Sequence, residues 1–215
     1  MDKESKRKML LTSDGFTTSK ITEALLRLID QSPNKSTAAI IPTAHGRLKS
    51  LAPVSIKAKQ AFESMGFQKS DFIDIEFENA EKLYDYDVIC LSGGNPYYLL
   101  HHLKSSGADK IIKELSNKGT VLVGISAGTV VLGPDIRIVD HFTPQFNHLG
   151  LNELTALELI QLVIFPHYGT NNKFPHEKTH ETRIQEFEKL YQHEVERITD
   201  NEAIYFNGGV IEKIT

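Results

Sequence analysis

The chain has 215 residues, of which 40% are hydrophobic and 24% are charged, and its formal net charge at pH 7 is −4. This length suits one domain with a full hydrophobic core, and the charge gives no basic field of the kind that attracts nucleic acid. No apolar stretch approaches the roughly 20 residues needed to span a bilayer, and no signal-peptide pattern is present. We therefore expect a cytoplasmic protein without nucleic-acid or membrane partners, and the sequence leaves open whether it is a monomer or a homodimer.

A single cysteine, Cys90, excludes a disulfide within the chain. It lies in an apolar run, which predicts a small core residue and not a nucleophile. The one dense basic run, 3–8, is predicted to be solvated, and we expect residues 1–7 to be a flexible tail on a single domain that spans 1–215.

Short β-rich runs alternate with helical patterns in the first half of the sequence, which predicts βαβ units and a largely parallel sheet. Thr17, Thr18 and Ser19 are candidate N-caps for the first helix, and Gly66 is expected to end the second. The predicted elements are a strand at 8–12, a helix with apolar residues at 21, 24, 25, 28 and 29, a strand at 38–41, a helix at 54–65, and a half-exposed alternating strand at 72–77.

The second half continues the alternation as far as a hairpin. The predicted elements are a strand at 88–91, helices at 97–104 and 109–117, a fully buried strand at 120–125, a helix directly after it, a segment at 156–165 that ends as a strand, and an amphipathic helix around 184–191. Asn207-Gly208-Gly209 between apolar runs predicts a hairpin of 203–206 with 210–214. The fold class is therefore α/β, with a doubly wound, mostly parallel sheet flanked by helices and a C-terminal β-hairpin.

The G-x-S-x-G motif Gly124-Ile125-Ser126-Ala127-Gly128 lies between the most buried strand and a helix. This is the setting of a nucleophile elbow, in which a sharp turn pushes the serine side chain into a cleft. Small neighbours are required there because the turn is crowded. Ser126 is therefore the candidate nucleophile, and the backbone amide of Ala127 could stabilise an oxyanion.

A serine nucleophile needs a base, and His167 is the best candidate among nine histidines. An apolar run delivers it to the end of a predicted strand, where ligand and catalytic groups of open α/β sheets collect. His45, His141, His148, His176 and His180 remain possible on position alone.

The acid that would orient the histidine is not fixed by spacing. Asp200 precedes the final hairpin and could reach His167. Asp140, Asp135 and Glu202 are rivals. The order Ser, acid, His, usual in α/β-hydrolases, would require Asp135 or Asp140.

A second glycine turn, Gly93-Gly94-Asn95, follows the strand at 88–91. Its amides could supply another oxyanion donor, and the side chain of Asn95 could bind a terminus of the substrate. A metal site is not expected, because His176 and His180 lack the glutamate of an H-E-x-x-H register. No cofactor is expected either.

Three motifs together, 91–100, 124–128 and Pro166-His167-Tyr168, resemble the aspartyl dipeptidase (dipeptidase E) and cyanophycinase family of serine peptidases. The resemblance covers nearly the whole chain. It implies a fold related to class I glutamine amidotransferases, with Ser126 as nucleophile, His167 as general base, and the amides of Gly94 and Ala127 as the oxyanion hole.

Two positions depart from the family pattern. The acid just before the last hairpin is usually Glu in the family and falls on Asp200 here, while an alternative acid after the serine helix falls on Asp140. An arginine that grips the substrate's aspartyl side chain is replaced by His180, a poor substitute for a bidentate guanidinium unless it is protonated or Arg183 compensates.

The function that the sequence predicts is hydrolysis of dipeptides or short peptides through a Ser-His-acid triad and an acyl-enzyme, with preference for an N-terminal Asp left open. The alternatives are another acyl-transfer hydrolase, an esterase or amidase, and a non-catalytic peptide-binding relative. The partner in every case is a small peptide or metabolite.

Overall fold

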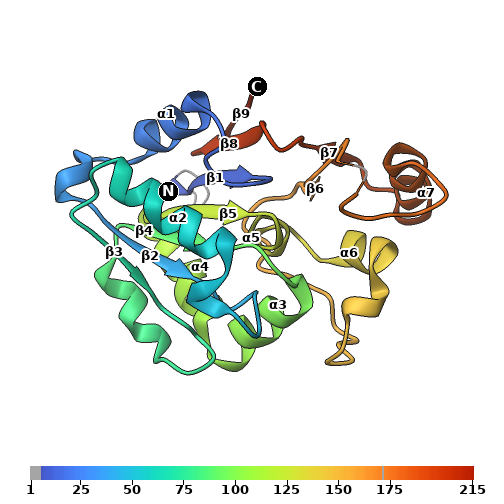
Figure 1. Ribbon diagram of the computed structural model, residues 1–215, viewed down its shortest axis with the longest axis horizontal. Coiled ribbons are helices and arrows are strands. Elements are labelled where there is room, and N and C mark those ends of the chain that lie inside the picture. Colours follow the sequence, from blue (N-terminus) through green and yellow to red (C-terminus); the bar gives the residue numbers. More distant parts are fainter. Residues whose placement is uncertain (1–5, 171) are drawn as a thin grey trace.

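The apolar runs form strands and the amphipathic segments form helices in the computed structural model, which describes residues 6–170 and 172–215 (Figure 1). The strands are β1 (Lys8–Thr12), β2 (Thr37–Ile41), β3 (Lys69–Phe72), β4 (Val88–Leu91), β5 (Val121–Ile125), β6 (Val163–Phe165), β7 (Val195–Arg197), β8 (Ala203–Asn207) and β9 (Val210–Ile214). The α-helices are α1 (Ser19–Leu28), α2 (Pro53–Ser64), α3 (Pro96–Ser105), α4 (Ala108–Lys118), α5 (Ala127–Leu132), α6 (Arg137–Phe142) and α7 (His180–Tyr191). Short 3₁₀ helices are η2 (Pro33–Lys35), η3 (Lys49–Leu51), η4 (Ala80–Asp85) and η5 (Pro144–Phe146).

The central sheet has seven strands in the order β3-β2-β4-β5-β1-β8-β9. The first five strands in that order pair in parallel, and the antiparallel β8–β9 hairpin extends the sheet beyond β1. Helices α1 and α2 cover one face of the sheet, while α3, α4 and α5 cover the other (Figure 1). The predicted α/β class and its C-terminal hairpin are confirmed.

Local sequence signals explain where several helices begin and end. The side chain of Thr18 caps α1 by accepting a hydrogen bond from the amide of Ile21. Gly66 follows α2 with φ of 81°, and Gly107 separates α3 from α4 with φ of 77°. Glycine adopts these left-handed conformations without strain, so the glycines at these two positions account for both turns.

The expected tail at 1–7 falls partly outside the described residues, because 1–5 are not among them. Arg7 is described, and its guanidinium donates to Asn117 and to the carbonyl of Leu159. The ordered fold therefore begins before residue 8.

The predicted strand at 72–77 is wrong beyond its first residue. β3 ends at Phe72, and the chain then turns around Asp74, whose carbonyl accepts hydrogen bonds from the amides of Phe77 and Glu78. Ile73 and Ile75 are both buried, so the apolar and acidic alternation there belongs to an aspartate-nucleated turn.

The segment at 156–165 is irregular before β6, with a left-handed Glu158 (φ of 52°) and a bend at 159–161, and becomes a strand only at β6. Backbone amides of Leu157 and Leu159 donate to the carbonyls of Val131 and Leu132, which ties this segment to the end of α5. β6 pairs in parallel with β7, a short strand that the sequence analysis missed. Together with α6 and α7, this pair lies to one side of the main sheet (Figure 1).

The register of β1 against β5 pairs Thr12 with Ile125 at the carboxyl ends of both strands. The amide of Ser126 donates to the carbonyl of Thr12 at 3.0 Å. Ser13 and Ser126 are therefore neighbours at the edge of the sheet where open α/β folds bind their ligands.

Candidate active site

Ser126 occupies a sharp turn between β5 and α5. Its backbone has φ of 50° and ψ of −105°, a conformation rarely adopted by a residue with a side chain. Glycine is needed on both sides: a Cβ on Gly128 would lie 2.0 Å from the carbonyl oxygen of Leu91, and one on Gly124 would lie 2.6 Å from the Cα of Thr129. The turn has the geometry expected of a nucleophile elbow.

His167 follows β6 and reaches Ser126 directly. Its Nε2 lies 2.9 Å from the Ser126 Oγ. Its backbone is left-handed, with φ of 60°, and its amide donates to the Ser13 Oγ at 2.7 Å. The structure therefore places the histidine singled out by the sequence within hydrogen-bond distance of the serine.

Asp200 lies on the other side of the imidazole. Its Oδ1 is 2.6 Å from the His167 Nδ1, while Ser13 donates to Oδ1 at 2.7 Å and Thr170 donates to Oδ2 at 3.0 Å. Ser126, His167 and Asp200 thus form one continuous hydrogen-bonded chain. Ser13 and Thr170, which orient the carboxylate, were missed by the sequence analysis.

The electrostatics of this chain favour a neutral imidazole beside an ionised carboxylate. Burial lowers the pKa of His167 below its ordinary value, although the hydrogen bond and charge of Asp200 act in the opposite direction. Burial would raise the pKa of Asp200, but hydrogen bonds from Ser13, His167 and Thr170 outweigh it and hold that pKa below its usual range.

The rival acids are engaged elsewhere: Glu202 accepts a hydrogen bond from the amide of Thr199 at 2.7 Å. Asp135 forms an ion pair with Arg137 at 2.6 Å, and Asp140 accepts a hydrogen bond from the Tyr97 hydroxyl at 2.8 Å. Asp200 is therefore the carboxylate that the structure brings to His167.

Gly94 forms a tight turn beside the serine. Its φ is 147°, and a Cβ there would lie 2.4 Å from the carbonyl oxygen of Ala44, so the position excludes any side chain. Gly94 and Ala127 line the same cavity as Ser126. The two residues with candidate oxyanion amides are therefore brought together with Ser126.

Asn95 was expected to bind substrate, but its side chain is used to cap a helix. Its side-chain oxygen caps α3 by accepting from the amides of Tyr97 and Tyr98, and its amide nitrogen donates to the carbonyl of Phe146. These bonds occupy the side chain, and Asn95 is not among the described residues that line the cavity. We correct its assignment from substrate binding to helix capping.

His180 also lies elsewhere than expected. It is the first residue of α7, and its imidazole packs against the rings of Phe142, Phe165 and Phe174, which line the cavity. His180 itself is not among the described lining residues. Direct contact with a substrate side chain therefore does not fit its position.

The cavity that opens on Ser126 has a volume of about 370 Å³ and is lined by segments from five parts of the fold. They are the turn after β1, the turn after β2 with the start of α2, the Gly93-Gly94 turn with the start of α3, the α5–α6 region with Phe146, and residues 165–167 with Lys173 and Phe174. Its size is that of a pocket for a small ligand.

Comparison with known protein families agrees with this arrangement. The family model described as peptidase family S51 matches residues 9–214. The chain belongs to peptidase family S51. It is a serine-type peptidase of the peptidase E kind, as the sequence resemblance predicted.

Relatives of this S51 peptidase cover most or part of its length. The uncharacterized peptidase Lmo0363 of Listeria monocytogenes serovar 1/2a is 31% identical over 176 residues, which are 80% of this chain and 82% of that protein. Peptidase E of a Nostoc species is 28% identical over 138 residues, 62% of this chain and 53% of that protein. The crystal structure of a candidate peptidase E protein from Listeria monocytogenes EGD-e superposes with a TM-score of 0.77 at 27% identity, covering 96% and 97% of the two chains.

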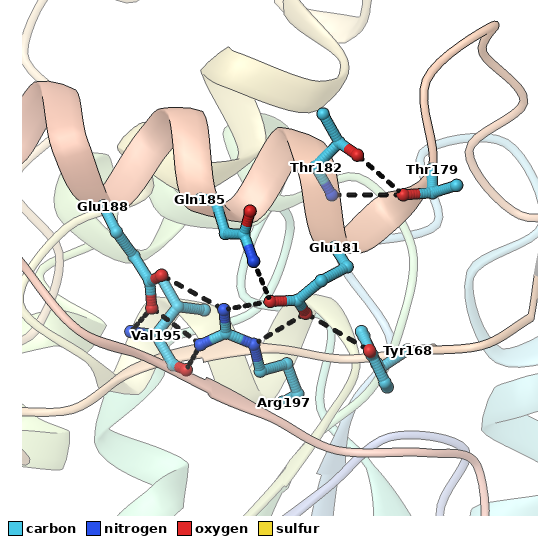
Figure 2. Close-up of polar contacts among 8 residues, drawn as sticks. All are labelled: Tyr168, Thr179, Glu181, Thr182, Gln185, Glu188, Val195 and Arg197. Atoms are coloured by element: carbon cyan, nitrogen blue, oxygen red, sulfur yellow. Dashed lines mark hydrogen bonds and ion pairs between the residues drawn. The ribbon is translucent and has the colours of Figure 1, made fainter.

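A hydrogen-bonded network around Arg197 supports the segment of the S51 peptidase that contains His167 and Tyr168 (Figure 2). The Arg197 guanidinium bridges Glu181 and Glu188 of α7, and Glu181 accepts a further hydrogen bond from the hydroxyl of Tyr168. The amide of Tyr168 in turn donates to the carbonyl of Ile198. The network therefore ties α7 and β7 to the residue that follows His167.

The described residues contain neither a cluster of metal ligands nor a helix that could cross a membrane. Residues 6–170 and 172–215 contain no group of three or more His, Cys, Asp or Glu placed to hold a metal ion. Within the same ranges, no helix combines the length and the apolar character needed to cross a bilayer.

Proposed function

We propose that this S51 peptidase hydrolyses dipeptides or short peptides with Ser126 as nucleophile, His167 as general base and Asp200 as the acid that orients it. The observation that carries the proposal is the continuous hydrogen-bonded chain Ser126–His167–Asp200 at the edge of a cavity of small-ligand size. A nucleophile, its base and an orienting carboxylate in this geometry are typical of acyl-transfer catalysis.

In the first half of the reaction, the Ser126 Oγ attacks the scissile carbonyl carbon while the Nε2 of His167 takes the serine proton. The carbonyl oxygen becomes an oxyanion, which accepts hydrogen bonds from the amides of Gly94 and Ala127. Collapse of this intermediate breaks the C–N bond, and His167 returns its proton to the leaving amine. The product on the enzyme is an ester of Ser126.

In the second half, a water molecule takes the place of the amine. The water oxygen attacks the ester carbonyl while His167 accepts a proton from the water. His167 then passes this proton to the Ser126 oxygen as the acid product leaves. Asp200 stays ionised throughout and stabilises the imidazolium that forms in each half.

Recognition of a free amino terminus is supported by Asp14. This half-buried carboxylate lines the cavity and interacts electrostatically with His167. Lys173 also lines the cavity and carries the opposite charge. A free dipeptide is a zwitterion, so Asp14 would pair with its ammonium group and Lys173 with its carboxylate.

Hydrolysis of free and N-acetylated dipeptides by the purified protein tests this proposal. Acetylation removes the ammonium charge, so we expect it to lower kcat/KM by about 10- to 100-fold, the range for a hydrogen bond to a charged group. In an Asp14→Asn variant, the ratio between free and acetylated peptides should fall toward one. Equal rates for both forms in the unaltered protein would argue against an exopeptidase, and loss of turnover in a metal chelator would argue against the serine mechanism.

The pH dependence of kcat/KM should report His167. Because burial holds the pKa of His167 below its ordinary value of 6.5, more than half of the enzyme carries the neutral, basic imidazole at pH 6.5. We expect kcat/KM to fall only as the pH drops through that lowered pKa, so its half-maximal point should lie below 6.5. A half-maximal point above 6.5, with circular dichroism unchanged over the range, would contradict the assignment.

A further inference from the structure

The cavity wall that continues from the nucleophile is apolar. It is formed by side chains of α5, α6 and the segments around β6, among them Val130, Ile138, Val139, Phe142, Phe165 and Phe174. Because α5 begins directly after Ser126, this wall starts next to the atom that would hold the acyl group. The side chain of the residue acylated on Ser126 is therefore expected to meet an apolar surface.

Two side chains of opposite charge also line the cavity. Among the described lining residues they are Asp14 and Lys173. Asp14 and Lys173 also line a neighbouring hollow bordered by α2 and residues 15–17, and Lys173 is exposed. Their place at the junction of two hollows suits the charged ends of a zwitterion and leaves the apolar wall without a charge.

Arg183 is close to this wall but is kept out of the cavity by Phe142. Its guanidinium stacks over the Phe142 ring at 3.9 Å and donates to the carbonyls of Phe142 and His141. The side chain is buried, and it is not among the described lining residues. Its hydrogen bonds and its stacking are therefore directed toward α6 and away from an incoming substrate.

His180 is likewise enclosed behind the wall. It is only 6% exposed, and neither ring nitrogen has a hydrogen-bond partner among the described residues. Burial, followed by the charge of Arg183, holds its pKa below the ordinary value. A neutral imidazole behind three phenylalanine rings offers no positive charge to a carboxylate in the cavity.

We infer that the site prefers peptides whose acyl-side residue carries an uncharged, apolar side chain, such as Leu, Met or Phe, over those with Asp at that position. This inference rests on the proposed function of Ser126. An apolar side chain gains free energy when it leaves water for this wall, whereas an aspartate side chain would lose its hydration there without a partner of opposite charge.

Aminoacyl-4-nitroanilides test the preference because they share one leaving group and differ only in the acyl residue. We expect kcat/KM for Leu-4-nitroanilide to exceed that for Asp-4-nitroanilide by on the order of 100-fold, comparable to the discrimination that a hydrophobic pocket achieves. An equal or higher value for the Asp compound would overturn the inference. Loss of that activity in Lys173→Ala would then identify Lys173 as the partner of the aspartate.

A charge introduced into the wall should change the ratio. Val139 is half-buried on α6, so an Arg can extend from it into the cavity, and Val139→Arg is expected to lower the Leu-to-Asp ratio at least about tenfold. Val210→Arg, at an exposed position of the β8–β9 hairpin, is the matched control and should leave the ratio unchanged. An unchanged ratio in Val139→Arg, in protein with a native circular dichroism spectrum, would contradict the inference.

Labelling with a fluorophosphonate separates failure of this inference from failure of the proposed function. A reactive Ser126 should be labelled whatever side chain the substrate carries, and the modified residue can be located by mass spectrometry. Labelling of Ser126 in a protein that shows no preference for Leu would overturn the inferred specificity but would still support Ser126 as the nucleophile. Absence of labelling, together with absence of turnover, would overturn the proposed function and this inference with it.

Discussion

Ser126→Ala should remove peptidase activity almost completely, lowering kcat for a good substrate by about 10³- to 10⁶-fold. The variant loses the attacking oxygen but keeps the Cβ, and the hydrogen bond of the Ser126 Oγ is made to His167 alone among the described residues. The fold should therefore be retained, with a melting temperature close to that of the unaltered protein. Steady-state hydrolysis and fluorophosphonate labelling measure the loss independently.

Ser55→Ala is a suitable control for that variant. Ser55 is a buried serine on α2 whose hydroxyl bonds to the hydroxyl of Ser92 at 3.0 Å, so its loss removes a buried polar contact without touching His167. We expect Ser55→Ala to keep its activity. A Ser126→Ala protein that retained more than a tenth of the original kcat would show that another residue is the nucleophile.

Asp200→Asn should lower kcat/KM by about 10²- to 10⁴-fold. An asparagine amide cannot stabilise the imidazolium of His167, and it favours the wrong tautomer of the neutral imidazole. Removing the charge of Asp200 also removes the contribution that raises the pKa of His167. The acid limb of the pH profile, where the remaining kcat/KM falls as the pH drops, should therefore move to lower pH. This shift distinguishes a residue that orients the base from one that only supports the fold.

Asp140→Asn is the counterpart of that variant at the rival position. The Tyr97 hydroxyl that donates to Asp140 can still donate to the oxygen of an asparagine, so we expect less than about a tenfold loss and no displacement of the acid limb. A greater loss in Asp140→Asn than in Asp200→Asn would assign the acid to α6 and overturn the triad proposed here.

Those parts of the site that depend on a single strand and its turn could be predicted from the sequence. Ser126 follows a run of five buried strand residues and is flanked by glycines at positions where a Cβ would collide with backbone. His167 follows an apolar run that ends as β6. Local burial and turn chemistry act over a few residues, so they leave a signal in the sequence itself.

Those parts that depend on which strands are neighbours could not be predicted in this way. Ser13 contacts His167 and Asp200 because β1 lies between β5 and β8 in the sheet, an order that periodicity does not reveal. Thr170 has no local signal for its contact with Asp200. The error at His180 has a similar origin, since Phe142 belongs to α6, a helix that the sequence pattern did not reveal.

The misassignment of Asn95 could have been avoided. Asparagine followed by proline at the start of an apolar helical pattern is a helix-capping signal, because the side chain satisfies free amides while proline suits the first turn. Asn95 and Pro96 fulfil both roles at the start of α3. A polar side chain next to a catalytic turn should therefore be tested against local capping before it is assigned to substrate binding.

The position of β1 in the sheet has a consequence for the newly made protein. Ser13 is translated early, but its partner Asp200 follows about 190 residues later, and β8, which pairs with β1, comes later still. A chain that ends before residue 200 therefore has Ser126 and His167 without the carboxylate that orients the imidazole. The proposed triad can therefore be completed only after the C-terminal part of the chain has been made and has folded against β1.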